Sequence, residues 1–191
     1  MDELSELVVT NKRAFREWLA ENHTDPSGVW LVLAKKGTTS PTSLNYDEAL
    51  DEALCFGWID GQLRRRDDAT YFQRFTPRRK RSKWSQHNVN RIERLTGDGQ
   101  MESPGLAAVV AAKADGRWEA AYPGRAGTTV PADLQAALDA APQAKAMFES
   151  LDSRNRFGIL YRIRDAKRAD TRARRIEQFV SVLAKGERPF S

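Results

Sequence analysis

The sequence predicts an α+β fold, in which a small, mostly antiparallel sheet packs with helices and a compact C-terminal helical lobe follows. Two observations predict the sheet: residues 29–34 form a continuous apolar run, and two arms around Asp67 and Asp68 have the pattern of a hairpin. A third observation predicts the lobe, because apolar residues recur at helical spacing from Pro131 onward. The predicted parts are an α+β domain at 1–122, a connector at 123–130 and a helical lobe at 131–191.

The first elements are a helix and a buried strand. Apolar residues recur at helical spacing within residues 10–22, and Thr10 or Asn11 can cap that helix. The run at 29–34 is rich in β-branched and aromatic residues, which predicts a strand buried on both faces. A second helix follows, with Ser43 or Asn45 as its cap, and ends at Gly57.

The hairpin comes next, and helices follow it. Its arms are residues 62–66 and 70–76. Ser82 or Ser85 can cap a helix that ends in the glycine turn at residues 97–99, and Pro104 begins another. Gly, Pro and Thr then mark the connector. In the lobe, helices are predicted from Pro131 and at residues 144–151, 153–166 and 171–185.

Composition limits the class of protein. The 191 residues carry a net charge of +5, which favours acidic partners, although a solvated basic surface has the same composition. The sequence has no apolar run of the ~20 residues that span a bilayer and no signal peptide at its N-terminus, so we expect a cytoplasmic protein. One cysteine and two histidines argue against a disulfide and a zinc site, and we expect no metal and no cofactor.

The candidate site lies within residues 52–84, where aromatic side chains, glycines and arginines alternate. Residues 62–84 carry nine basic side chains against two acidic ones, so this stretch attracts anions. Asp60 alternates with Trp58 in the chain, so an extended backbone places a carboxylate beside an indole, where it can act as a general base. The alternative is that Asp60 begins a turn and that Trp58 belongs to the core.

Arginines at the end of the second hairpin arm can form forked contacts to one carboxylate or phosphate, with a threonine hydroxyl beside them. They can also be an exposed strand end that pairs with local acids. The following helix presents further side chains on one face. The predicted ligand-binding residues are Trp58, Arg74, Phe75, Thr76, Arg78, Lys83, Trp84, Asn88 and Arg91, and the candidate catalytic residue is Asp60. His87 is expected to be a surface hydrogen-bonding residue and Cys55 an inert packed thiol.

A second basic surface lies in the helical lobe. It is formed by Lys167, Arg168, Arg172 and Arg175. Arg172 and Arg175 are three residues apart on a predicted helix and can hold a phosphate. The alternative is a salt-bridge clasp with Asp165 and Asp170.

Four blocks of the sequence are distinctive: ALCFGWIDG, YFQRFTPRRKRSKWS, NVNRIERL and AKRADTRARRIEQFV. They resemble the bacterial YdeI/OmpD-associated family, also called bacteriocin-protection or OmdA-type proteins. The blocks are spread over nearly the whole chain. The resemblance implies a shared fold, a shared site and a role in stress or antimicrobial resistance, and it names no chemical reaction.

Three functions are compatible with these observations. The first is a stress- or antimicrobial-resistance protein that binds a small anionic or peptide-like molecule in an aromatic, arginine-lined pocket, or acts on it by acid–base catalysis. The second is a nucleic-acid-binding module that stacks bases on its aromatic residues, and the third is an adaptor that binds a partner protein. The sequence contains no phosphate-binding glycine loop, HExxH, GxSxG or CxxC motif. We favour the first function because the aromatic residues lie between turn signals, as in a walled pocket, and because the sequence has no helix-turn-helix or RNA-binding-sheet signature.

Overall fold

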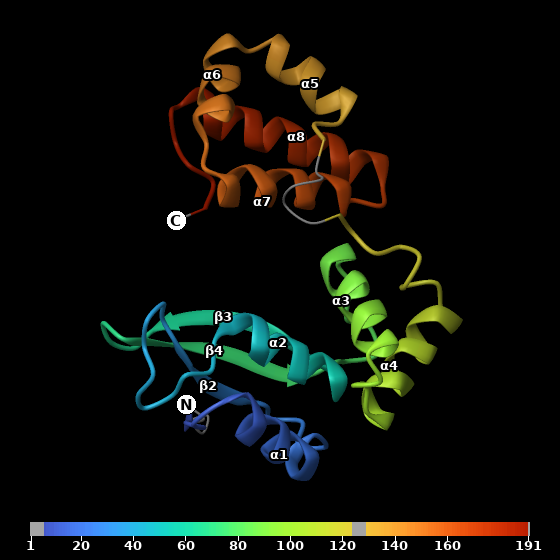
Figure 1. Ribbon diagram of the computed structural model, residues 1–191. Helices are drawn as coiled ribbons and strands as arrows, with labels where there is room; N and C mark the ends of the chain where they lie inside the picture. Colours follow the sequence, from blue (N-terminus) through green and yellow to red (C-terminus); the bar gives the residue numbers. More distant parts are fainter. Residues whose placement is uncertain (1–5, 124–128, 191) are drawn as a thin grey trace. The chain divides into compact units, whose positions relative to one another are not determined.

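The computed structural model describes residues 6–123 and 129–190. The chain forms two compact units, Met1–Tyr122 and Pro123–Ser191 (Figure 1). Most of the predicted connector at 123–130 falls on residues 124–128, which lie outside the described residues.

Within the described residues, the first unit contains one four-stranded sheet in the order β1-β2-β4-β3. Its strands are β1 (Glu6–Leu7), β2 (Val29–Ala34), β3 (Trp58–Arg65) and β4 (Thr70–Pro77). β1 runs parallel to β2, whereas β4 runs antiparallel to both β2 and β3. The predicted α+β class and the mostly antiparallel sheet are confirmed, and all six residues of β2 are buried as its apolar run predicted.

The β3–β4 hairpin differs from its prediction at one end. β3 begins at Trp58, four residues before the expected arm, because the Asp60-Gly61 pair does not end the strand. The pairing with β4 shifts between Asp60 and Leu63, so the extra residues form a bulge in a continuous strand. At the other end, the Asp67 carboxylate accepts hydrogen bonds from the backbone of Ala69 and Thr70 and closes the turn.

Among its described residues, this unit also contains α1 (Lys12–Asn22), α2 (Tyr46–Cys55), α3 (Gln86–Gly97) and α4 (Ser103–Ala114). Three of these helices begin at a side-chain cap, and in each case the structure uses one of the two candidates. Asn11 caps α1, Asn45 caps α2 in a capping box with Glu48, and Ser85 caps α3.

One face of the sheet forms the core with α1 and α2 (Figure 1). Phe15 of α1 packs against Phe75 of β4 with ring centroids 5.9 Å apart, and Trp18 meets the edge of Trp58 at 5.7 Å. Leu31 of β2 is fully buried on this same face. The alternation of the strands therefore places Trp30 and Arg74, which pair across β2 and β4, on the opposite face.

Helix α4 packs closely on the end of α2. Gly105 of α4 lies so close to α2 that an added Cβ atom would be 2.2 Å from the carbonyl oxygen of Cys55. The backbone of Glu102, just before α4, donates a hydrogen bond to that same carbonyl. Glycine is therefore required at residue 105 for this contact.

The second unit is helical throughout its described residues. It consists of α5 (Ala132–Asp139), α6 (Pro142–Ser150), α7 (Ser153–Arg164) and α8 (Ala169–Ala184). Residues such as Leu138, Phe148, Ile163 and Phe179 form a core of its own, which confirms the predicted helical region. A surface hollow of about 770 Å³ lies between α5 and α8.

In the part of the chain that the structure describes, no helix is long and apolar enough to cross a membrane.

Candidate functional site

The site is centred on a stacked pair, Arg78 and Trp84, in the first unit. The Cζ atom of Arg78 lies 3.6 Å from the centroid of the Trp84 ring. Arg78 directly follows β4, and its backbone N–H donates to the carbonyl of Gly57 next to β3. Trp84 precedes the N-cap of α3, and its carbonyl accepts from the N–H of Tyr122. The end of the hairpin and the start of α3 thus position the two side chains.

Both side chains have buried donors that are not used. The Nη1 of Arg78 donates to the carbonyl of Lys83 at 3.1 Å. Its Nε and Nη2 atoms and the Nε1 of Trp84 are buried and have no hydrogen-bond acceptor among the described residues. Since burying a polar group without a partner costs about 1–3 kcal/mol, such a cluster is unusual in a structural core.

The charge of Arg78 is also poorly compensated. Burial lowers the pKa of Arg78 to about 10, and the nearby Arg117 lowers it further, while Asp60 and Tyr122 oppose the shift. Asp60 itself accepts a hydrogen bond from the hydroxyl of Tyr46 at 2.9 Å. Burial and this carboxylate both raise the pKa of Tyr46, so the phenol remains a donor at neutral pH. The guanidinium is thus a desolvated cation beside a carboxylate that is already engaged.

The structure brings some predicted site residues together and separates others. Asp60, Arg78 and Trp84 lie in one neighbourhood, with the carbonyl of Lys83. Trp58 and Phe75 are fully buried in the core, where the Nε1 of Trp58 donates to the carbonyl of His23. These two rings and that of Trp84, which is 1% exposed, present no open face for a base to stack on.

Arg74 and Thr76 lie on the other face of the sheet. Arg74 pairs with Trp30 in the register of β2 and β4, and Thr76 pairs with Ile59 across the hairpin. The Nη2 of Arg74 donates to the carbonyl of Ser27. The structure therefore separates these two predicted ligand residues from the Arg78–Trp84 pair.

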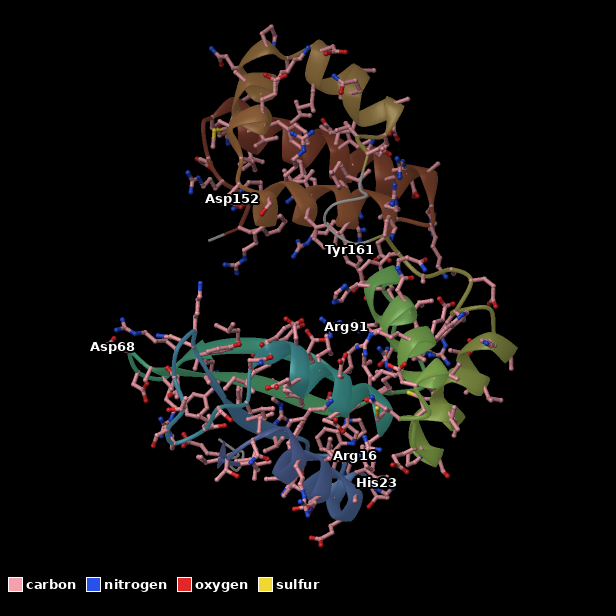
Figure 2. The ribbon with its side chains drawn as sticks, in the orientation of Figure 1. Arg16, His23, Asp68, Arg91, Asp152 and Tyr161 are labelled. Atoms are coloured by element: carbon pink, nitrogen blue, oxygen red, sulfur yellow. The ribbon has the colours of Figure 1, made fainter. Side chains whose placement is uncertain are left out.

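Arg91 of α3 connects this helix to α2 (Figure 2). Its guanidinium pairs with Asp51 at 2.7 Å and with Asp47, and its Nε donates to His87 at 2.9 Å. Arg91 and Asp51 are only 16% and 14% exposed. Asn88 is buried one helical turn earlier. Arg91 thus has carboxylate partners within the first unit.

In the second unit, the arginines of the predicted basic surface contact carboxylates and backbone carbonyls. Arg172 of α8 makes a forked contact with Asp133 of α5, at 2.5 and 2.9 Å, and lines the hollow between these helices. Arg168 pairs with Asp170 at 3.1 Å, while Arg175 donates to the carbonyl of Arg162. The carboxylate that pairs with Arg172 is thus Asp133, whereas the predicted clasp used Asp165 and Asp170.

A second buried charge cluster was not anticipated from the sequence. Glu52 of α2 is 2% exposed and pairs with Arg16 at 2.7 Å and with Lys12 at 3.2 Å. Arg16 of α1, labelled in Figure 2, also donates hydrogen bonds to Glu102 and to the carbonyl of Gln100. In the sequence, Glu52 stands next to the apolar residues Ala53 and Leu54, and this apolar neighbourhood is the feature from which its burial could have been predicted.

Metal ligation and thiol chemistry have little basis in the described residues. No group of three His, Cys, Asp or Glu residues there could hold a metal ion. Cys55 is buried, and burial raises the pKa of its thiol to about 11. At neutral pH the thiol is therefore protonated and a weak nucleophile.

Comparison with known protein families gives two matches. Residues 7–108, more than half of the chain, match the family described as "Domain of unknown function (DUF8412)". Residues 128–186 match the OmdA family, described as "Bacteriocin-protection, YdeI or OmpD-Associated". The resemblance noted in the sequence is confirmed for this second segment, whereas its three N-terminal blocks fall within the first match. No curated protein and no solved structure matches the chain.

Proposed function

Because the chain belongs to the family described as "Domain of unknown function (DUF8412)", whose description names no activity, we propose its function from the site itself. The OmdA match suggests a bacteriocin-protection or stress-type protein. Within that role, the first unit binds a small anionic or peptide-like ligand, and Arg78 and Trp84 are the residues that hold it.

The observation that carries this proposal is the set of three buried nitrogen donors, Nε and Nη2 of Arg78 and Nε1 of Trp84, that have no acceptor among the described residues. The Nε and Nη2 atoms form one edge of the guanidinium, which matches the two oxygens of a carboxylate or of a phosphate. The Nη1 atom is committed to the Lys83 carbonyl and fixes the direction of that edge. The indole N–H adds a donor for a further oxygen of the ligand.

Electrostatics favour the same ligand class. Burial destabilises the charged form of Arg78, as its lowered pKa shows, so an anion beside it regains Coulomb energy in a medium of low dielectric constant. Asp60 is held by Tyr46 and gives the site a negative side. A ligand with a carboxylate at one end and an N–H donor at the other, such as a peptide terminus, complements both residues. An acid–base step at Asp60 stays a prediction.

Binding of N-acetylglycine, measured by calorimetry on the full chain, tests the proposal. Replacing Arg78 with Gln keeps a polar side chain but shortens it and removes its charge. We expect Arg78→Gln to weaken binding at least about tenfold, because the lost contact is charge-assisted and desolvated. Trp84→Phe keeps a ring under the guanidinium and removes the indole N–H, and we expect it to weaken binding by a smaller factor.

The matched control is Arg79→Gln, which removes an equal charge from the neighbouring, exposed residue. It should change the affinity less than about twofold, since exposed charges are screened by water and salt. Equal losses from Arg78→Gln and Arg79→Gln would mean that net charge, and not the buried donors, attracts the ligand. The proposal would then be wrong.

A further inference from the structure

A separate cluster of aromatic and basic side chains lies on the sheet face opposite the core. The alternation of β2, β3 and β4 places Trp30, Phe72, Arg64 and Arg74 on this face, because Trp30 pairs with Arg74 and Phe72 pairs with Arg64. The Arg78–Trp84 site does not include any of these residues. We call the four residues the Trp30 face.

Two guanidinium groups share one indole ring on the Trp30 face. The Cζ atom of Arg64 lies 4.2 Å from the centroid of the Trp30 ring, and that of Arg74 lies 5.8 Å from it. Phe72 meets the edge of Trp30 at 6.5 Å and completes the floor. Trp30 is only 6% exposed, so its ring supports the two cations and fixes where they stand.

The charges of Arg64 and Arg74 are not neutralised by an ion pair within the described ranges 6–123 and 129–190. Among the described residues, no carboxylate forms an ion pair with Arg64 or Arg74, and the field of Arg64 helps to lower the pKa of Arg74 after the effect of burial. Asp25 acts on Arg74 in the opposite direction, and it is itself engaged with Ser27. The neighbouring Arg66, in contrast, pairs with Asp67 at 2.6 Å.

Arg74 also has an unused donor. Its Nη2 donates to the Ser27 carbonyl, whereas its Nη1 is buried without an acceptor among the described residues. Gly61, in the bulge of β3, lies directly against the Arg74 stem, where an added Cβ atom would be 3.4 Å away. The bulge and the Ser27 carbonyl together hold Arg74 in place beside an exposed Arg64.

We propose that Arg64 and Arg74 bind one phosphate group over the ring of Trp30. A carboxylate has two oxygens and one charge, so a single guanidinium fork already satisfies it. Inorganic phosphate or a phosphate monoester has a charge of about −1.5 to −2 at neutral pH and at least three acceptor oxygens, so it can bridge two guanidinium groups. These properties favour a free ion or a small phosphate monoester, because a nucleic-acid phosphodiester has one charge and two non-bridging oxygens; a nucleic-acid backbone is the alternative source that the experiment tests.

The test is titration of the full chain with inorganic phosphate at constant ionic strength, followed by the NMR signals of the arginine Nε–H groups. We expect Arg64→Gln and Arg74→Gln each to weaken binding about tenfold, the loss of one charge-assisted contact. The matched control is Arg65→Gln, because Arg65 is exposed, follows Arg64 directly and points to the other side of the strand. It should weaken binding less than about twofold.

Two results would overturn this proposal. If Arg65→Gln weakens binding as much as Arg64→Gln, phosphate responds to general charge and not to the Trp30 face. If Arg78→Gln abolishes phosphate binding while Arg64→Gln does not change it, the anion occupies the other site. Both results overturn the proposal for the Trp30 face, and neither contradicts the proposal for Arg78 and Trp84, because the variants lie in different clusters.

A second titration, with a short oligothymidylate, distinguishes the two sources of phosphate. If the oligonucleotide competes with inorganic phosphate and Arg64→Gln weakens its binding, the site accepts a nucleic-acid backbone. Its affinity should then fall with salt at a log-log slope of roughly −0.7 for each phosphate contacted. If inorganic phosphate binds at Arg64 and the oligonucleotide does not compete with it, the site is selective for small phosphates.

Discussion

The guanidinium of Arg78 lies over the ring of Trp84, 3.6 Å from its centroid, while buried N–H groups of both residues have no acceptor in the part of the chain that the structure describes. This relationship differs from that of Arg91, which is similarly enclosed but forms ion pairs with two carboxylates. The first arrangement costs stability and the second contributes to it, so the two arginines should respond to mutation in opposite ways.

We therefore predict that Arg78→Met raises the free energy of unfolding by about 1 kcal/mol, because it removes buried donors that have no partners. Arg91→Met should lower it by about 1 kcal/mol, because Asp47 and Asp51 lose this cation and Asp51 keeps only its pair with Arg94. Urea unfolding followed by tryptophan fluorescence measures both. All five tryptophans belong to the first unit, so the signal reports on that unit. A loss of stability in Arg78→Met would show that the residue is a structural support.

The buried carboxylate of Glu52 gives a second prediction. Glu52→Gln should lower the free energy of unfolding by about 3 kcal/mol, because Arg16 and Lys12 both lose their common partner inside the first unit. The control is Glu17→Gln, which breaks an exposed ion pair between Glu17 and Arg13 within α1. It should cost less than about 0.5 kcal/mol. Equal costs, again from fluorescence-detected urea unfolding, would contradict the structural role given to Glu52.

The contact of α4 with α2 gives a third prediction. Gly105→Ala should destabilise the first unit by about 2 kcal/mol, because the new methyl group collides with the carbonyl oxygen of Cys55. Gly97→Ala is the control, since its Cβ atom would meet nothing within 4 Å at the end of α3. It should stabilise the protein by a few tenths of a kcal/mol, since alanine has the higher helix propensity. Thermal unfolding of the two variants should therefore shift in opposite directions.

A fourth prediction concerns pH and the second unit. The hydrogen bonds from Arg172 lower the pKa of Asp133, so this carboxylate stabilises the folded state fully above its unfolded pKa of about 3.9. That contribution disappears as the pH falls through the lower, folded pKa. Asp133→Asn should cost about 0.5–1 kcal/mol near pH 7, a small value because the pair is partly exposed and screened by solvent.

Amide hydrogen exchange in α8 measures this cost, since the second unit contains no tryptophan. The difference between Asp133→Asn and the wild type should shrink below about pH 4. Asp170→Asn, which breaks a more exposed pair with Arg168, is the control near pH 7 and should cost less. A difference that is independent of pH would mean that Asp133 acts through packing and not through its charge.

The sequence predicted the elements of the fold where one local signal dominates. An unbroken apolar run identified β2, and polar caps narrowed the start of α1, α2 and α3 to two candidate residues each. The predicted start of β3 was wrong because Asp-Gly is a common turn signal. In the structure the Asp60-Gly61 pair lies at a bulge within the strand, where the register between β3 and β4 shifts. A register depends on the partner strand, which the local sequence does not contain.

The site was predictable in part. The crowding of aromatic and basic residues in one stretch led to the choice of Arg78 and Trp84 as candidate ligand-binding residues, and that role stays a prediction. The sequence did not show that Arg74 and Arg78, both in or beside β4, belong to different faces and to different clusters. The partners Tyr46, Arg117 and Tyr122 come from distant segments and carry no local signal of their contact with this region.

The core of the first unit closes only with residues near its end. The ring of Trp118 packs on Trp84 at 4.9 Å, and the backbone of Tyr122 donates to the carbonyl of Trp84. During synthesis, therefore, the Arg78–Trp84 pair cannot reach its final packing until the ribosome has released the chain through residue 122. From that moment the first unit has every residue of its own core, so it can fold while the helices of the second unit are still being translated.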